Sequence, residues 1–122
     1  MILADTSVWV DHFRGGNITL EGLLNSSQIL MHPMVVAELA LGSLADRKQT
    51  LADLDMLPQA LVARLDEVRQ MIETRQLQSQ GIGLTDAHLI AAMFLNSPAL
   101  LWTRDKRLRS VAERFGIHAQ LP

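Results

Sequence analysis

The sequence predicts an α/β fold with a mainly parallel sheet flanked by helices. Short apolar runs alternate along the chain with segments of helical periodicity, which is typical of parallel strands joined by crossover helices. The 122 residues, 48% of them hydrophobic, suffice for one core, so we expect a single domain over residues 1–122. The chain has no cysteine, which excludes disulfide scaffolds and thiolate metal sites.

Four short segments are predicted strands. They cover residues 1–4, 28–32, 99–102 and 116–119. Brief apolar runs bounded by turn residues are typical of buried strands, and the last segment is expected at a sheet edge. Asp5 follows the first run and Asp105 lies just past the third. In an open parallel sheet, polar residues after the strands gather at one edge, where sites form.

Helical spacing and end signals predict helices between the strands. The expected ranges are 6–14, 20–24, 33–41, 46–57, 61–80, 86–96 and 104–115. The fifth range carries an apolar stripe, which we expect to face the core: Leu61, Leu65, Val68 and Ile72. Thr85 is the expected N-cap of the sixth helix, which is apolar nearly all round and therefore predicted to be buried.

The charge of the chain is unevenly distributed. The net charge of −2 argues against a non-specific coat for duplex DNA. Residues 1–61 carry a net charge of −4 and residues 62–122 a net charge of +2, and residues 104–114 alone hold five basic and two acidic groups. A basic stripe of this kind can bind a polyanion on an otherwise acidic protein.

No segment of the sequence is predicted to cross or bind a membrane. The longest run without a polar residue, residues 89–95, is too short to cross a bilayer. Met1 leads directly into apolar residues without a basic segment, so no secretory signal is expected. The absence of cysteine suits a reducing compartment, and a cytoplasmic location is the expectation.

Four carboxylates border apolar elements: Asp5, Glu38, Asp86 and Asp105. Three of them have ordinary structural interpretations. Asp5 can cap a helix. Asp86 can be stabilised in a first turn by the positive end of the helix dipole, and Asp105 can pair with Arg109 one turn further on. Glu38 is harder to explain in this way, because its helix is apolar on most sides and an unpaired buried carboxylate is costly.

Together the four acids predict a metal site. Converging carboxylates repel each other unless a cation lies between them, and a set of oxygen ligands favours Mg²⁺ or Mn²⁺. Such a site can activate water and stabilise the transition state of phosphodiester hydrolysis. No side chain stands out as a covalent nucleophile, so attack by a metal-activated water is the expected chemistry.

Four short motifs, in order, resemble those of the PIN domain. They are Ala4-Asp5-Thr6-Ser7, Val36-Ala37-Glu38-Leu39, Thr85-Asp86-Ala87-His88 and Trp102-Thr103-Arg104-Asp105. Their order, spacing and the chain length look like a VapC-type toxin of a bacterial toxin–antitoxin pair. The resemblance covers essentially the whole chain and implies a three-layer sandwich with a central, mainly parallel sheet.

The resemblance also implies a function and a set of site residues. The expected activity is that of a metal-dependent endoribonuclease, held inactive by a VapB-type antitoxin and paired as a homodimer. By motif match, Asp5, Glu38, Asp86 and Asp105 would be the catalytic and metal-binding acids. Hydroxyl support would come from Thr6, Ser7 and Thr103. The RNA backbone would meet the basic residues beside the last acid, Arg104, Lys106, Arg107 and Arg109.

Two other functions remain open at this point. A phospho-acceptor receiver domain also needs acids that bind Mg²⁺, together with a Thr and a Lys such as Thr103 and Lys106. A receiver domain requires a pair of acids after the first strand, but in this sequence Asp5 stands alone there. It also requires an acid at the end of a central strand, whereas Asp53 and Asp55 lie in a helical pattern. The other alternative is a catalytically inactive PIN-like interaction module, against which the intact acidic set argues.

Overall fold

The computed structural model describes residues 1–122 and contains one sheet of three parallel strands. These are β1 (Ile2–Ala4), β2 (Ile29–Leu30) and β3 (Leu100–Trp102), in the order β2-β1-β3. Within the central strand, Ile2 is in register with both Ile29 and Leu100. The parallel pairing confirms the predicted sheet type and brings the carboxyl ends of all three strands to one edge.

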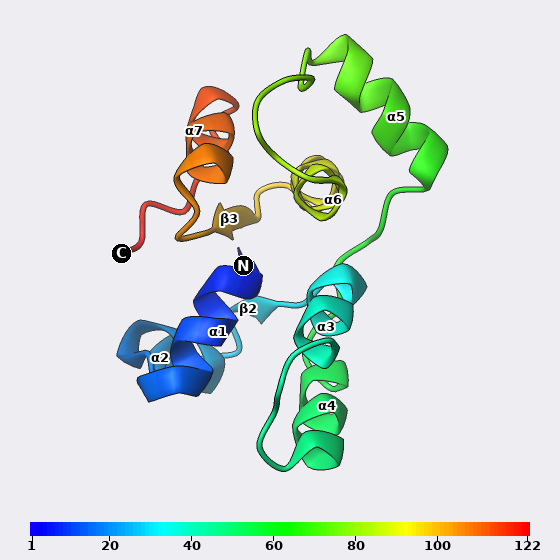
Figure 1. The fold of residues 1–122 in the computed structure, drawn as a ribbon. Helices are drawn as coiled ribbons and strands as arrows, with labels where there is room; N and C mark the ends of the chain where they lie inside the picture. Colours follow the sequence, from blue (N-terminus) through cyan, green and yellow to red (C-terminus); the bar gives the residue numbers. More distant parts are fainter.

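Seven helices surround this sheet. They are α1 (Thr6–Gly15), α2 (Ile18–Asn25), α3 (Pro33–Ala40), α4 (Arg47–Asp55), α5 (Leu65–Thr74), α6 (Leu84–Leu95) and α7 (Lys106–Arg114). In Figure 1 the sheet is viewed along its strands, with α1, α2 and α7 on one side and α3 to α6 on the other. The structure therefore confirms the α/β class and the three-layer arrangement.

The core lies on both faces of the sheet. Leu3, Leu101 and Trp102 are completely buried, and they belong to a cluster of 24 buried apolar residues. Residues 87–93 of α6 are all buried, which confirms the prediction of a buried helix. None of the helices has the length and apolar character needed to cross a membrane.

The helix expected over residues 61–80 is much shorter, because α5 covers only Leu65–Thr74. The backbone of Leu61 pairs with the side chain of Asn96: its amide donates to Oδ1 and its carbonyl accepts from Nδ2, each at 3.0 Å. These bonds replace the helical ones at residue 61. At the other end, Gln76 has a φ of 55°, which ends the helix. The predicted stripe is correspondingly wrong at Leu61 and Leu65, which are 66% and 55% exposed.

Other predicted boundaries also differ from the structure. The second helix is Ile18–Asn25 and not 20–24, the fourth is Arg47–Asp55 and not 46–57, and the second strand is Ile29–Leu30 and not 28–32. Three further differences concern α6, α7 and the end of the chain. The N-cap of α6 is Gly83, not Thr85, because Asp86 Oδ2 accepts a 3.2 Å hydrogen bond from the Gly83 amide. The last helix begins at Lys106 and not at residue 104, since Asp105 is its N-cap. The terminal strand expected over residues 116–119 is reduced to one isolated bridge, between Leu101 and His118.

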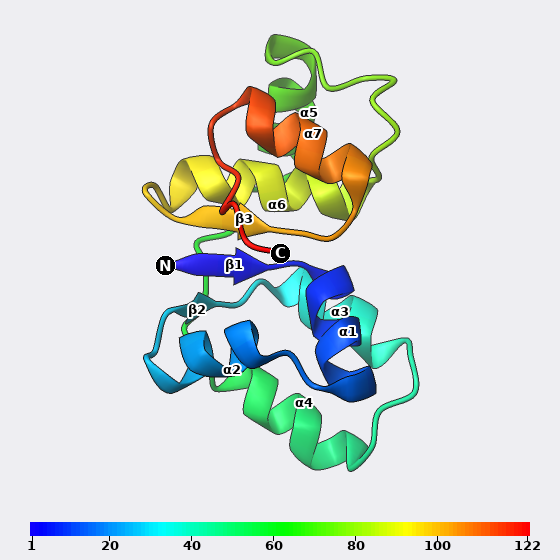
Figure 2. The same cartoon turned by 90° about the vertical axis from the view of Figure 1, so that its left-hand side faces the viewer.

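The fold places several helix starts at one end of the molecule. Figure 2 views the sheet from the side, with β1 pointing toward the end where α1, α6 and α7 begin. Asp5 links β1 to α1, and Asp105 caps the helix that follows β3. Asp86 lies in the first turn of α6. The short connections after parallel strands thus bring acids that are distant in sequence to the same edge.

Candidate active site at the carboxyl edge of the sheet

Asp5 is the most enclosed of the four predicted acids, with only 5% of its surface exposed. Its Oδ1 accepts hydrogen bonds from the Val8 amide, at 3.3 Å, and from the Ser7 hydroxyl. Its Oδ2 accepts from the Thr103 hydroxyl. Burial raises the pKa of the Asp5 carboxyl, while the bonds from Ser7 and Thr103 lower it. Asp5 is thus both a helix cap and a carboxylate held in one orientation.

Thr103 connects the two loops that carry Asp5 and Asp105. Besides donating to Asp5, its fully buried hydroxyl accepts a 3.0 Å hydrogen bond from the Asp105 amide. The Arg104 amide donates to the Ser7 hydroxyl, also at 3.0 Å. The start of α1 and the loop after β3 are therefore joined by hydroxyl groups, which fixes the backbone on both sides of the site.

Glu38 enters the site from α3 and lies on the surface. Its Oε1 accepts a 2.7 Å hydrogen bond from the Thr6 hydroxyl at the start of α1. Asp105 is also exposed, and its Oδ1 accepts a 2.9 Å bond from the Leu108 amide, as expected of an N-cap. It forms no ion pair with Arg109, so the surface pair considered from the sequence is absent.

Asp86 is close enough to the other three acids for their charges to affect its pKa. Burial is the largest cause of its raised pKa, and the bond from the Gly83 amide acts in the opposite direction. The negative charges of Asp5, Asp105 and Glu38 each raise the Asp86 pKa further. No basic side chain offsets the effect of these negative charges on the Asp86 pKa. The acids therefore form a region of concentrated negative charge.

This donor set suits a hard divalent cation. Carboxylate oxygens are the ligands that Mg²⁺ and Mn²⁺ prefer, and a cation would offset the mutual repulsion seen at Asp86. The side chains as they stand do not form a complete ligand shell, because no three Asp, Glu or His groups come close enough together to hold one ion. The residues fit a metal by their chemistry and charge, and Asp5 and Glu38 are already oriented by hydroxyl donors.

The four predicted RNA-binding residues have different surroundings. Arg104 forms a 3.4 Å ion pair with Asp11, and Arg109 donates a 3.2 Å hydrogen bond to the Thr103 carbonyl. The Arg107 side chain lies against Gly81, so closely that a Cβ at that position would stand 2.7 Å from its Cδ. Lys106 is exposed and makes no ion pair or side-chain hydrogen bond. Its ammonium group is thus the most available of the four for an outside anion.

The sequence reasoning missed His32, the residue that precedes α3. It is fully buried and caps α3, the helix of Glu38, because its Nδ1 accepts a 3.0 Å hydrogen bond from the Met34 amide. Burial, followed by the nearby charge of His88, lowers the pKa of His32 to about 4. A polar residue immediately before a proline at the first helical position was the available sequence indication of this cap.

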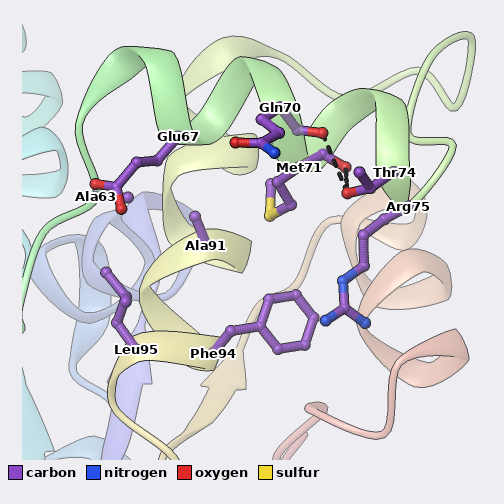
Figure 3. Close-up of a pocket in the computed structure, with 9 residues that line it drawn as sticks. All are labelled: Ala63, Glu67, Gln70, Met71, Thr74, Arg75, Ala91, Phe94 and Leu95. Carbon is purple, nitrogen blue, oxygen red and sulfur yellow. Dashed lines mark hydrogen bonds between the residues drawn. The ribbon is translucent and has the colours of Figure 1, made fainter.

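Two of the cavities in the molecule bear on the location of the site. One, of about 310 Å³, separates α5 from α6 (Figure 3), where the Arg75 guanidinium lies 4.1 Å from the centre of the Phe94 ring. None of the predicted site residues lines it. The other, of about 390 Å³, lies between α1 and α3 and includes Glu38 in its wall. Of these two cavities, the second therefore adjoins the predicted site.

The fold and the arrangement of acids define the class of protein. A family model described as the PIN domain matches residues 2–114, and the chain belongs to that family. Asp53 and Asp55 lie on α4 and not at the end of a strand, so the acid pattern of a receiver domain is absent.

The chain is also similar to two curated relatives of the same name. Both are called Ribonuclease VapC32 and come from Mycobacterium tuberculosis, strains CDC 1551 / Oshkosh and ATCC 25618 / H37Rv. Each is 42% identical over 117 residues, which cover 96% of this chain and 94% of the relative. The similarity thus extends over nearly the full length of both proteins.

Proposed function

We propose that this protein is a divalent-metal-dependent endoribonuclease and the toxin component of a type II toxin–antitoxin system. The observation that carries this proposal is the gathering of Asp5, Glu38, Asp86 and Asp105, three of which raise the pKa of the fourth. Membership of the PIN family and the similarity to relatives named as VapC ribonucleases support it.

The four acids would hold the metal, which we propose to be Mg²⁺ or Mn²⁺. When bound, such an ion supplies an activated water and stabilises the charge that develops on the phosphodiester. The Ser7 and Thr103 hydroxyls hold Asp5, and the Thr6 hydroxyl holds Glu38, so each of these two carboxylates is oriented before a metal binds. Preorganised groups of this kind reduce the cost of reaching the transition state.

The basic residues beside Asp105 would bind the RNA backbone. Lys106 has no protein partner and is proposed to contact phosphate directly, as is Arg104 at the edge of the site. Arg107 extends the same positive surface. Arg109 is proposed to act in part through Thr103, whose carbonyl accepts its hydrogen bond. A positive surface beside a negative metal site directs the strand toward the acids.

We further propose that residues 1–122 act as one domain, in the cytoplasm, as a homodimer that a VapB-type antitoxin restrains. The cluster of 24 core residues supports a single domain. Exposed apolar side chains around α5 and α6 support a contact with a second copy: Leu61, Val62, Leu65, Leu84 and Leu95. Surfaces of this kind are typical of interfaces between protein molecules.

The decisive experiment is a time course of the purified, partner-free protein on total cellular RNA with Mg²⁺, Mn²⁺ or EDTA. The Asp5→Asn variant is the test, because asparagine also caps helices and the fold should survive. Asp55→Asn is the matched control, since Asp55 is an exposed acid on α4 far from the site. We expect discrete metal-dependent fragments from the wild type and from Asp55→Asn, and none from Asp5→Asn. Undiminished cleavage by folded Asp5→Asn would contradict the proposal, and binding without any cleavage would favour an inactive interaction module.

A further inference from the structure

The cavity between α1 and α3 begins at the proposed active site. Its wall on α3 includes Glu38 and Leu39, and its wall on α1 includes Val10, Phe13 and Arg14. Figures 1 and 2 both show α1 and α3 side by side. Its volume of about 390 Å³ lies in the range of small-molecule binding sites, which are mostly apolar with a few polar groups.

Helical spacing connects this cavity to the acids. Thr6, Val10 and Phe13 follow one another at intervals of one turn, so their side chains share a face of α1. The Thr6 hydroxyl bonds to Glu38, while Phe13 and Arg14 stand at the far end of the same helix. At a rise of 1.5 Å per residue, Arg14 lies about 12 Å along the helix axis from Thr6. A short stretch of single-stranded nucleic acid can cover that distance.

The lining of the cavity matches the chemistry of a nucleotide. Val10 and Leu39 offer apolar walls, and Phe13 leaves 42% of its surface exposed, which is unusual for a residue of its size. Arg14 is exposed and has no ion pair or side-chain hydrogen bond. Aromatic rings stack with any nucleobase, and an unpaired guanidinium binds phosphate.

We propose that this cavity is a subsite for one nucleotide next to the cleaved bond, with its base against Phe13 and a phosphate at Arg14. The inference deepens the proposed ribonuclease function and rests on it. The cleaved phosphodiester would lie at the inner end, where Glu38 helps to hold the metal, and Arg14 would bind the phosphate on the far side of the nucleotide. The base occupies the apolar section between them.

The test uses variants that separate stacking from packing. Phe13→Leu keeps an apolar side chain beside Trp9, whose ring lies 5.8 Å from that of Phe13, while Phe13→Trp keeps an aromatic face. Arg14→Ala removes the cation and Arg14→Lys retains it. Met56→Ala is the matched control, because Met56 is 84% exposed and lines neither this cavity nor the acidic site. Thermal unfolding of each variant checks that the fold is intact.

Two readouts are made for each variant. Fluorescence anisotropy measures binding of short labelled oligo(A) and oligo(U) to proteins that also carry Asp5→Asn, and cleavage is measured without it. Phe13→Leu should weaken binding roughly 5- to 100-fold, and Phe13→Trp should restore it. Arg14→Ala should reduce the slope of log affinity against log salt by about one, and Arg14→Lys should preserve the slope.

The outcomes distinguish failure of the subsite from failure of the function. Unchanged binding and cleavage in both Phe13→Leu and Arg14→Ala, with an active wild type, would overturn the subsite and leave the ribonuclease standing. Absence of cleavage by the wild type together with absence of RNA binding would overturn both.

Discussion

The hydroxyl of Thr6 donates a 2.7 Å hydrogen bond to Oε1 of Glu38, joining the first residue of α1 to the middle of α3. Both side chains are accessible to solvent, so water could satisfy their polar groups if the bond were absent. It restricts the position of the Glu38 carboxylate. If Glu38 binds the metal as proposed, the bond serves the orientation of this carboxylate more than the stability of the fold.

We expect Thr6→Val to separate these two roles. The substitution keeps the shape of the side chain and removes the donor, so RNA cleavage should fall about 10-fold, as is typical when a group that orients a ligand is lost. The free energy of unfolding should change by less than about 1 kcal/mol, because the bond is exposed. Thr6→Ser should restore cleavage. Wild-type rates in Thr6→Val would show that Glu38 needs no orientation.

Metal binding should stabilise the protein through the acids. The charges of Asp5, Asp105 and Glu38 act on Asp86 and no basic side chain offsets them, so a bound cation would relieve their repulsion. Free Mg²⁺ at ten times its dissociation constant would add about 1.4 kcal/mol, or about 3–6 °C in melting temperature relative to EDTA.

The Asp86→Asn variant provides the control for this metal effect. With one negative charge fewer, it should melt above the wild type in EDTA and gain less from Mg²⁺. Asp55→Asn should behave like the wild type in both conditions. Scanning calorimetry or circular dichroism can make the comparison, and an equal Mg²⁺ response in Asp86→Asn would exclude Asp86 as a ligand.

Acid should weaken the fold through His32. The pKa of His32 in the folded protein is about 4, against 6.5 for an ordinary histidine. Between these two pH values the histidine is protonated in the unfolded chain and neutral in the folded protein. This contribution to stability is therefore present at neutral pH and is lost as the pH falls toward 4. Protonation of Nδ1 would also remove the acceptor for the Met34 amide, and with it the cap of α3.

The His32→Asn variant isolates this effect, because asparagine keeps an acceptor for the helix cap. Between pH 7 and pH 4.5, the wild type should lose about 2 kcal/mol more free energy of unfolding than His32→Asn. Urea denaturation at a series of pH values measures the difference. Parallel pH profiles for the two proteins would contradict the role assigned to His32.

Replacement of Lys106 should affect RNA binding alone, whereas replacement of Arg109 should affect both RNA binding and the cleavage rate. Lys106 has no partner in the protein, so Lys106→Ala should weaken binding to all RNA sequences and lower the salt slope by about one. Arg109 bonds to the Thr103 carbonyl, and Arg109→Ala should also reduce kcat, since Thr103 holds Asp5. Binding titrations at several salt concentrations, together with single-turnover cleavage, separate the two effects. Identical behaviour of the variants would show that Arg109 only contacts RNA.

The sequence predicted the sheet and most helices because their signals are local. Asp5 and Asp105 could be placed at one edge since each comes just after a strand. The extent of α5 could not be predicted, because the bonds that keep Leu61 out of the helix come from Asn96, 35 residues further along the chain. The bond from Arg109 to the Thr103 carbonyl is local, but it depends on the path of the loop before α7. Periodicity carries no information about either contact.

The bond between Thr103 and Asp5 has a consequence for the synthesis of the chain. The two residues are 98 positions apart, and the central strand β1 lacks its neighbour β3 until residues 100–102 have been made. A nascent chain that ends earlier has Asp5 without its buried hydroxyl partner and lacks Asp105 altogether. If the protein cuts RNA as proposed, an active nascent chain could cleave the RNA of the ribosome that is making it or the messenger RNA being translated. Assembly of the site from both ends of the chain delays that activity until translation is almost finished.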